Sequence, residues 1–356
     1  MPASIYTINN REYRVLDTPH FKRVRSEIYN LDFMKVNGFM KRWGRTAEED
    51  TKYSPIGPEI LDIEISVNGC PNKCPFCYKS NSDAPPTNMS FKTFKKIIDK
   101  FPKTLTQVAF GITGVQTNPE FLDMLCYCRF RDIVPNFTLS GVDLTPHLAD
   151  EISKYVGAVA VSVYGDKNLG YNTVNMFTSR GVKQTNIHLM VARETLEHVF
   201  EVLRDSQTDP RLKDLNAIVF LSLKPKGRGS KYHPLIEVEF LSLVQYCVEH
   251  KLSFGFDSCS AYKFQQVIDT LSVSEDTKRM MRDCTEPCES SLFSSYVNVK
   301  GEYWNCSFCE GNKEVNPVDV LKAKDFLKDV WYNPSVVEFR NRVLKARDVP
   351  CPVYNV

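Results

Sequence analysis

Strand-like apolar runs and amphipathic helical segments alternate along residues 60–258, and this alternation limits the possible folds more than any other feature of the sequence. The runs of strand character occupy 60–67, 106–112, 136–141, 157–165, 184–192, 216–224 and, more briefly, 252–258. Helical spacing of apolar residues predicts helices at about 90–101, 119–130, 145–156, 168–180, 194–205 and 236–250. Repeated βαβ units build parallel sheets that are covered by helices. We therefore predict an α/β fold whose strands form a full or partial barrel.

The two ends of the chain lack this alternation. Residues 1–56 are polar and mix basic with aromatic residues, so we predict an irregular N-terminal segment. From residue 259 onward the chain is rich in cysteine. The predicted organisation is an N-terminal segment (1–56), a barrel (57–258) and a small C-terminal extension (259–356).

Twelve cysteines occur in a chain of 356 residues that shows no sign of export. The first residues contain no apolar segment of the signal-peptide kind, and no apolar run approaches the ~18 residues of a membrane span. In a reducing compartment, clustered cysteines bind metals more often than they form disulfides. We therefore expect a cytoplasmic protein with no membrane partner. A net charge of +2 gives no reason to expect a nucleic-acid partner, although HFKRVR and MKRWGR near the N-terminus are locally basic.

The stretch CPNKCPFC, residues 70–77, places three thiols directly after the first predicted strand. In parallel α/β barrels, the loops at the carboxyl ends of the strands carry the chemistry. A structural zinc site uses four protein ligands, whereas a [4Fe–4S] cluster bound by only three thiolates keeps one iron without a protein ligand. That iron can bind a cofactor. The alternative is half of a zinc ribbon that distant cysteines complete.

The same residues resemble the signature of the radical S-adenosylmethionine enzymes, Cys-x3-Cys-x-aromatic-Cys after the first strand of a partial (β/α)6 TIM-like barrel. Cys70, Cys74, Phe76 and Cys77 match this signature position by position. The resemblance implies that the cysteines hold a [4Fe–4S] cluster, that S-adenosylmethionine binds the open iron, and that Phe76 lies beside its adenine. It also implies reductive cleavage of S-adenosylmethionine to a 5′-deoxyadenosyl radical that abstracts a substrate hydrogen, with an external electron donor of the flavodoxin or ferredoxin type.

Other cofactor contacts of the family match less closely. The family's second strand ends in Gly-Gly-Glu-Pro, whereas this chain reads FGITGVQTNPEF (110–121), so the glutamate of the motif is missing. Because glycine permits close approach of the backbone, we still expect this segment to contact the amine of the cofactor. For Ser162 and His188, a purely structural role is the alternative. The cofactor-binding residues that the resemblance implies are Gly111, Thr113, Gly114, Ser140, Ser162 and His188.

Cysteines near the C-terminus form a second motif, Cys288-x12-Gly301-x4-Cys306, followed by Cys309. Alternating residues on either side of Gly301 predict a β-hairpin that brings the flanking cysteines together. The motif resembles the opening of the SPASM and twitch extensions, which hold auxiliary clusters, but the further cysteine run of a full SPASM domain is absent. The resemblance implies one auxiliary [4Fe–4S] cluster with four ligands, Cys259, Cys288, Cys306 and Cys309. A structural zinc site is the alternative.

The remaining cysteines have alternative roles in this scheme. Cys284 and Cys351 are alternative ligands of the auxiliary cluster. Cys259 ends the last predicted strand, where it suits either a cluster ligand or a catalytic thiol that donates a hydrogen atom to the substrate radical. The two roles exclude each other because a bound thiolate has no S–H to give, and we favour the ligand. Three cysteines lie among apolar residues of predicted helices and are expected in the core: Cys126, Cys128 and Cys247.

The loop KPKGRGSK, residues 224–231, follows the sixth predicted strand. Its cations and glycines could bind a carboxylate or a phosphate. A run of charges in a loop is more often a solvated surface, and that is our prediction.

These features predict a radical S-adenosylmethionine enzyme with a peptide or protein side chain as its substrate. Within the family, auxiliary clusters of this type are commonest among peptide- and protein-modifying enzymes. No leader-binding domain is evident in residues 1–56, so a small molecule such as a sugar or a nucleoside is the alternative substrate. An alternative of another class is a non-catalytic zinc-binding interaction module.

Overall fold

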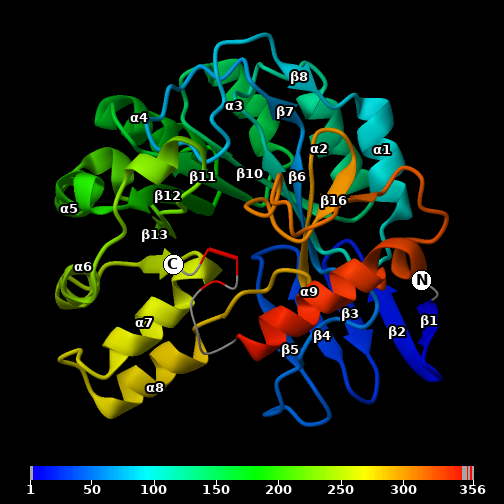
Figure 1. The fold of residues 1–356 in the computed structure, drawn as a ribbon. Helices are drawn as coiled ribbons and strands as arrows, with labels where there is room; N and C mark the ends of the chain where they lie inside the picture. The colour runs from blue at the N-terminus through cyan, green and yellow to red at the C-terminus, as the bar shows by residue number, and fades with distance from the viewer. Residues whose placement is uncertain (1–2, 347–350, 352, 355–356) are drawn as a thin grey trace.

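The computed structural model describes residues 3–346, 351 and 353–354. Seven parallel strands follow one another across its central sheet in chain order, each hydrogen-bonded to the next (Figure 1). They are β6 (Ile60–Glu64), β9 (Gln107–Gly111), β10 (Val134–Leu139), β11 (Ala158–Ser162), β12 (Gln184–Val191), β13 (Ala217–Ser222) and β14 (Phe254–Phe256). All seven strands predicted from the sequence are present. The predicted α/β fold with a parallel sheet is confirmed.

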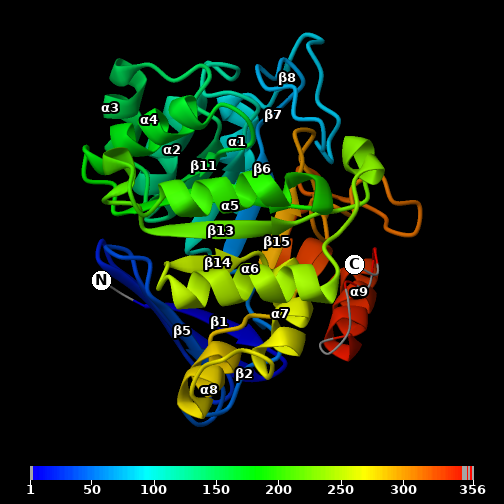
Figure 2. The ribbon, with the colours of Figure 1, turned by 90° about the vertical axis from the view of Figure 1, so that its left-hand side faces the viewer.

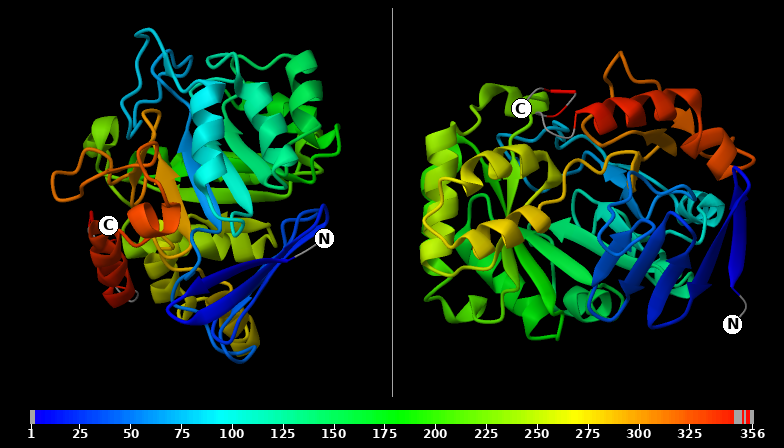
Figure 3. Two further views of the ribbon diagram at one scale, coloured as in Figure 1. Left: turned by 90° about the vertical axis from the view of Figure 1, so that its right-hand side faces the viewer. Right: turned by 90° about the horizontal axis from the view of Figure 1, so that it is seen from below.

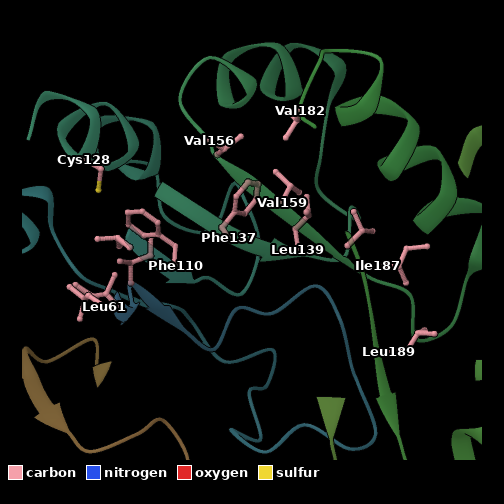
Figure 4. Packing of buried hydrophobic residues seen from close by; sticks show 14 of the residues in the cluster. Leu61, Phe110, Cys128, Phe137, Leu139, Val156, Val159, Val182, Ile187 and Leu189 are labelled. Atoms are coloured by element: carbon pink, nitrogen blue, oxygen red, sulfur yellow. The ribbon is translucent and has the colours of Figure 1, made fainter. Parts of the chain in front are cut away.

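Helices cover the outer face of this sheet (Figures 1 and 2). They are α1 (Phe91–Lys100), α2 (Phe121–Phe130), α3 (Pro146–Ser153), α4 (Lys167–Thr178), α5 (Leu196–Asp205) and α6 (Glu237–Glu249). Helix α1 begins where the side chain of Ser90 accepts a hydrogen bond from the backbone N–H of Thr93. The main core lies between strands and helices: Phe137 and Val159 point from the sheet toward the helices, and Cys128 points from α2 toward the sheet (Figure 4).

Among the described residues, the sheet does not close into a full barrel. The far edge of β6 pairs with β15 (Ser294–Val297) of the C-terminal region and not with β14. Strand β15 continues through a turn at Gly301, with φ +82°, into β16 (Glu302–Trp304), which pairs with β17 (Val318–Asp319). The predicted hairpin is therefore present, but it extends the barrel sheet and does not stand apart from it.

The N-terminal segment is not irregular, so that prediction is wrong. It forms a five-stranded antiparallel sheet in chain order: β1 (Ser4–Ile8), β2 (Arg11–Asp17), β3 (Phe21–Arg25), β4 (Asn30–Met34) and β5 (Met40–Trp43). The sheet lies at the amino ends of the parallel strands (Figure 3). The ammonium group of Lys22 donates to the carbonyl of Leu105, and the amide of Gln184 donates to the carbonyl of Asn37. The segment therefore covers the end of the barrel that lies away from the cysteine loop.

The described residues contain further elements. They are β7 (Ser66–Val67), β8 (Thr87–Asn88), α7 (Ala261–Ile268), α8 (Glu275–Asp283), the π-helical turn Leu327–Trp331, α9 (Pro334–Lys345) and the 3-10 turns Arg193–Thr195, Pro210–Leu212, Gly227–Lys231 and Ser258–Ser260. No helix in the part of the chain that the structure describes is long and apolar enough to cross a membrane.

Two of the three predicted core cysteines are buried, and the third is not. Cys128 and Cys247 are fully buried, whereas Cys126 is exposed. Successive residues of an α-helix are about 100° apart, so residues two apart face nearly opposite directions. Cys126 and Cys128 therefore cannot both face the core from α2.

Candidate functional site

A cavity of about 810 Å³ lies at the carboxyl ends of the parallel strands. It is bordered by all three cysteines of the loop after β6, and by residues of β9, β10, β11, β12 and β13. Tyr296 of β15 and Phe308 of the C-terminal region also line it. The cavity is therefore shared between the barrel and the cysteine-rich extension.

The cysteine loop follows β6 and is folded by local turns. The backbone N–H of Cys77 donates to the carbonyl of Cys74 over 3.3 Å, and the thiol of Cys70 lies 3.1 Å from the carbonyl of Asn72. Burial raises the pKa of Cys70, and it raises the pKa of Cys74 to about 11; the charges of the neighbouring thiolates contribute to both shifts. Three half-buried thiols within one loop suit a cationic metal centre, which would bind all three as thiolates.

A second loop holds the cysteine loop in place. Arg228 donates from Nε to the carbonyl of Cys74 over 3.0 Å, and its backbone N–H donates to the carbonyl of Cys77 over 3.0 Å. Gly227 has φ +56°, and a Cβ there would lie 2.4 Å from the carbonyl oxygen of Tyr78. Only glycine allows both this conformation and this approach. The loop 224–231 is thus packed against the cysteines and is not the solvated surface that the sequence predicted.

Most of the predicted cofactor-binding residues line the same cavity. Phe76 makes edge-to-face contacts with Tyr164 and Tyr232, at ring-centroid distances of 4.9 and 5.7 Å. Gly114 is not among the described residues that line the cavity, and a Cβ there would instead meet the carboxylate of Asp143. The predicted residues that do line the cavity are Phe76, Gly111, Thr113, Ser140, Ser162 and His188.

Ser140 and His188 face the cavity in different surroundings. The side-chain amide of Asn72, in the cysteine loop, donates a hydrogen bond to Ser140 Oγ. Asn72 itself lines the cavity and was not anticipated from the sequence. Burial lowers the pKa of His188 to about 4, so its imidazole is neutral at pH 7. A neutral imidazole can accept or donate a hydrogen bond but offers no charge to a ligand.

The predicted ligands of the second cluster gather outside the cavity. Cys306 and Cys309 lie on one turn with their sulfur atoms 3.3 Å apart, and Cys309 is fully buried. The hydrogen bond between the two thiols lowers the pKa of Cys306 and raises that of Cys309. Cys288 packs in the same hydrophobic cluster, and burial raises its pKa to about 12.

The other candidate ligands of the second cluster differ in their surroundings. Cys259 lies in the turn Ser258–Ser260 and is not among the described residues that line the cavity. Burial raises its pKa, and the negative charges of Asp257, Cys288 and Cys351 contribute to the shift. The charge of Cys351 also contributes to the raised pKa values of Cys288 and Cys309. Cys284 is exposed at the end of α8. Three of these thiols, Cys288, Cys306 and Cys309, therefore share one hydrophobic cluster, and Cys259 and Cys351 interact with that group through their charges.

A polar network that the sequence did not suggest connects the two cysteine regions. Lys79, two residues after Cys77, forms an ion pair with Glu64 over 3.0 Å and a second ion pair with Glu310, which follows Cys309. Its ammonium group also donates to the hydroxyl of Tyr296 over 2.6 Å. No motif in the sequence could have indicated these contacts, because Lys79 and Glu310 are 231 residues apart.

Within the described residues, no group of three or more His, Cys, Asp or Glu side chains is arranged to hold a single metal ion. No protein-family model matches the chain, and no curated protein sequence matches it. Solved structures do match. Streptococcus suis SuiB bound to S-adenosylmethionine aligns with a TM-score of 0.64 and 15% sequence identity, over 83% of this chain and 73% of SuiB.

The chain has the fold of the radical S-adenosylmethionine enzymes. SuiB bound to its precursor peptide SuiA aligns with a TM-score of 0.65 and 13% identity, over 92% of this chain and 90% of that structure. The protein anSMEcpe with bound S-adenosylmethionine and the Cp18Cys peptide aligns with a TM-score of 0.59 and 14% identity, over 81% and 84%. At such low identities the likeness establishes the radical S-adenosylmethionine fold and leaves the activity of this chain to be proposed.

Proposed function

We propose that this protein is a radical S-adenosylmethionine enzyme that modifies a peptide or a protein side chain. The observation that carries the proposal is the cavity: the three thiols of the cysteine loop and six predicted cofactor-binding residues border the same space. The fold supports it, because structural neighbours hold S-adenosylmethionine together with a peptide or were solved with a precursor peptide. All twelve cysteines are free thiols, which suits a cytoplasmic protein.

In this proposal Cys70, Cys74 and Cys77 hold a [4Fe–4S] cluster. When bound, such a cluster would supply the electron for reductive cleavage of S-adenosylmethionine, with a flavodoxin- or ferredoxin-type donor as the source of that electron. Arg228 fixes the loop through backbone carbonyls, so it orients the three thiolates without competing for the metal. Phe76 and the residues at the end of β9 then position the cofactor at the wall of the cavity.

The C-terminal thiols form the second site of the proposal. Cys288, Cys306 and Cys309 with either Cys259 or Cys351 would hold an auxiliary [4Fe–4S] cluster, because four thiolates complete such a site. Their hydrophobic surroundings would shield the cluster from water. Tyr296 and Phe308 place this region against the cavity, where a substrate would lie.

The test is the formation of 5′-deoxyadenosine by anaerobically reconstituted protein under reducing conditions. The wild type should be brown, because iron–sulfur clusters absorb broadly in the visible range, and it should form 5′-deoxyadenosine. Cys74→Ala should form none. Cys126→Ala is the matched control, because this thiol is exposed on α2 and belongs to neither cysteine region. A colourless wild type that contains zinc and leaves S-adenosylmethionine intact would refute the proposal in favour of a zinc-binding module.

A further inference from the structure

One carboxylate in the cavity has no partner. Asp62 lies in the middle of β6, where Leu61 and Ile63 face the helices and are buried, so that Asp62 faces the other side of the sheet. The side chain of Asp62 borders the open space of the cavity and is exposed to it. In the parallel register with β15, Asp62 lies beside Tyr296, so this carboxylate is on the wall that the barrel and the C-terminal region share.

The other charged groups of the cavity wall are compensated. Glu64 pairs with Lys79 over 3.0 Å, and the ammonium group of Lys224 lies 3.6 Å from Asp257. The ammonium group of Lys73 lies 2.6 Å from Asp83. Asp166 accepts two backbone N–H groups at the start of α4. His188 is neutral at pH 7 because burial lowers its pKa to about 4.

Asp62 has no such compensation. In the part of the chain that the structure describes, its carboxylate makes no hydrogen bond and no ion pair. The titratable groups that act on it are Cys306 and Glu289 of the C-terminal region, and neither is a cation. Burial, with the negative charges of these two groups, raises the pKa of Asp62 to about 7. Burial also raises the pKa of Tyr78, and the charges of Glu64 and Asp62 contribute to that shift.

A carboxylate that faces a cavity and has no cation of the protein beside it attracts a cation that enters the cavity. We propose that Asp62 is the anchor for a positively charged group of the substrate, such as the ammonium group of a lysine side chain or the guanidinium group of an arginine side chain. The inference rests on the proposed function, because it names the kind of peptide that this cavity takes. It makes Asp62 a specificity-determining residue on the wall between the two cysteine regions.

The anchor has a pH dependence of definite sign. The carboxylate form binds a cation and the protonated form does not, so binding should strengthen as pH rises through about 7. A lysine ammonium group, with an ordinary pKa near 10.4, stays charged throughout this range. An uncharged side chain of the same length should show no such dependence.

The experiment compares two synthetic peptides that differ only in the charged group. Acetyl-Gly-Lys-Gly-amide and acetyl-Gly-norleucine-Gly-amide are titrated into reconstituted holoenzyme with saturating S-adenosylmethionine, and binding is followed by saturation-transfer NMR at pH 6 and pH 8. We expect the wild type to prefer the lysine peptide by about tenfold at pH 8, the size of one favourable charge contact, and by clearly less at pH 6. Asp62→Asn should abolish the preference.

Two controls identify the source of the preference. Asp62→Glu should restore part of it, because the charge returns. Asp166→Asn should keep all of it: Asp166 also borders the cavity, and asparagine preserves the start of α4. Equal binding of both peptides by the wild type, or an unchanged preference in Asp62→Asn, would overturn the inference.

A further measurement separates this inference from the proposed function. The same samples are assayed for S-adenosylmethionine affinity and for 5′-deoxyadenosine formed without peptide, and Asp62→Asn should change neither. A loss of S-adenosylmethionine affinity in Asp62→Asn would assign the carboxylate to the cofactor and refute the substrate anchor. Absence of 5′-deoxyadenosine from the wild type would refute the proposed function, whatever the peptides show.

Discussion

The two cysteine regions of this protein are built in opposite ways. The first places three thiols within eight residues of one loop, half-buried, on the wall of a cavity. The second draws on separate parts of the chain: Cys288, Cys306 and Cys309 lie among apolar side chains and outside the cavity, and Cys259 and Cys351 interact with them through their charges. In our proposal the first arrangement would leave a bound metal centre open to a further ligand, and the second would enclose it. The position of the thiols in the fold, more than their number, would thus distinguish a catalytic metal site from an enclosed metal site that binds no further ligand.

The supports of the two regions also differ. Arg228 holds the first loop through carbonyl oxygens, and its charge is permanent at any ordinary pH. The second region adjoins a buried ionic cluster in which Arg42 of β5 pairs with Glu289 and lies 3.4 Å from Glu59. Tyr29 of the N-terminal sheet donates to Glu59 over 2.6 Å. The second region is therefore linked to the N-terminal sheet by groups that respond to pH.

The largest effect should come from removing each region's thiols in turn. Replacing Cys70, Cys74 and Cys77 together with Ala should abolish 5′-deoxyadenosine formation and remove about half of the ~8 iron atoms expected for two four-iron clusters. Replacing Cys306 and Cys309 with Ala should remove the other half and leave S-adenosylmethionine cleavage without substrate intact. Iron analysis and chromatography of the nucleoside measure both results. Loss of cleavage in the second variant, with the first cluster present, would show that the regions do not act separately.

The two variants should also differ in stability. Metal binding by enclosed ligands contributes to folding free energy, so we expect the Cys306, Cys309 variant to unfold at a temperature lower by on the order of 5 °C. The loop variant should change far less, because its thiols border a cavity. Calorimetry of both reconstituted variants, and of wild type treated with a chelator, measures the difference. Equal shifts in the two variants would contradict the contrast between an open and an enclosed site. If the second variant keeps all its iron and loses one zinc instead, the C-terminal region is a structural zinc site.

A smaller effect should distinguish two glycines, one beside each region. Gly227 and Gly311 both have positive φ, +56° and +79°, but a Cβ at Gly227 would lie 2.4 Å from a carbonyl oxygen, whereas nothing lies within 4 Å at Gly311. Alanine should cost about 1 kcal/mol at Gly311 through the backbone alone, and clearly more at Gly227. Denaturant unfolding measures both, and iron content should fall only in Gly227→Ala. A similar loss of unfolding free energy at the two sites would mean that the loop 224–231 adjusts to the added Cβ and does not fix the cysteines.

The smallest effect concerns pH. Burial raises the pKa of Glu59 to about 7 from an ordinary value of 4.5. Between these values the folded protein holds a proton that the unfolded chain has released, so stability should fall as pH rises from about 4.5 to about 7. The slope for one proton is at most about 1.4 kcal/mol per pH unit. Glu59→Gln should flatten this part of the profile in denaturant unfolding, and an unchanged slope in that variant would exclude Glu59 as its source.

Local patterns in the sequence predicted much of the fold. The seven parallel strands, the helices between them and the hairpin around Gly301 all follow from short-range periodicity and from turn and cap residues such as Ser90. The N-terminal sheet was missed, because its short strands mix charged, polar and apolar residues and the segment therefore reads as polar. Cys126 was misplaced because an apolar neighbourhood in the sequence does not say which side of a helix a residue faces.

The sequence by itself determined the cysteine loop: eight consecutive residues after a strand carry the three thiols, and no distant segment is needed to recognise them. Only the tertiary structure decided what surrounds that loop. Arg228 reaches Cys74 across 154 residues, Lys79 meets Glu310 across 231, and β15 joins the barrel beside Asp62. The physical reason is that helix and strand periodicity are set by neighbouring residues, whereas these contacts depend on how distant strands pair and on which charges are left without a partner when they do.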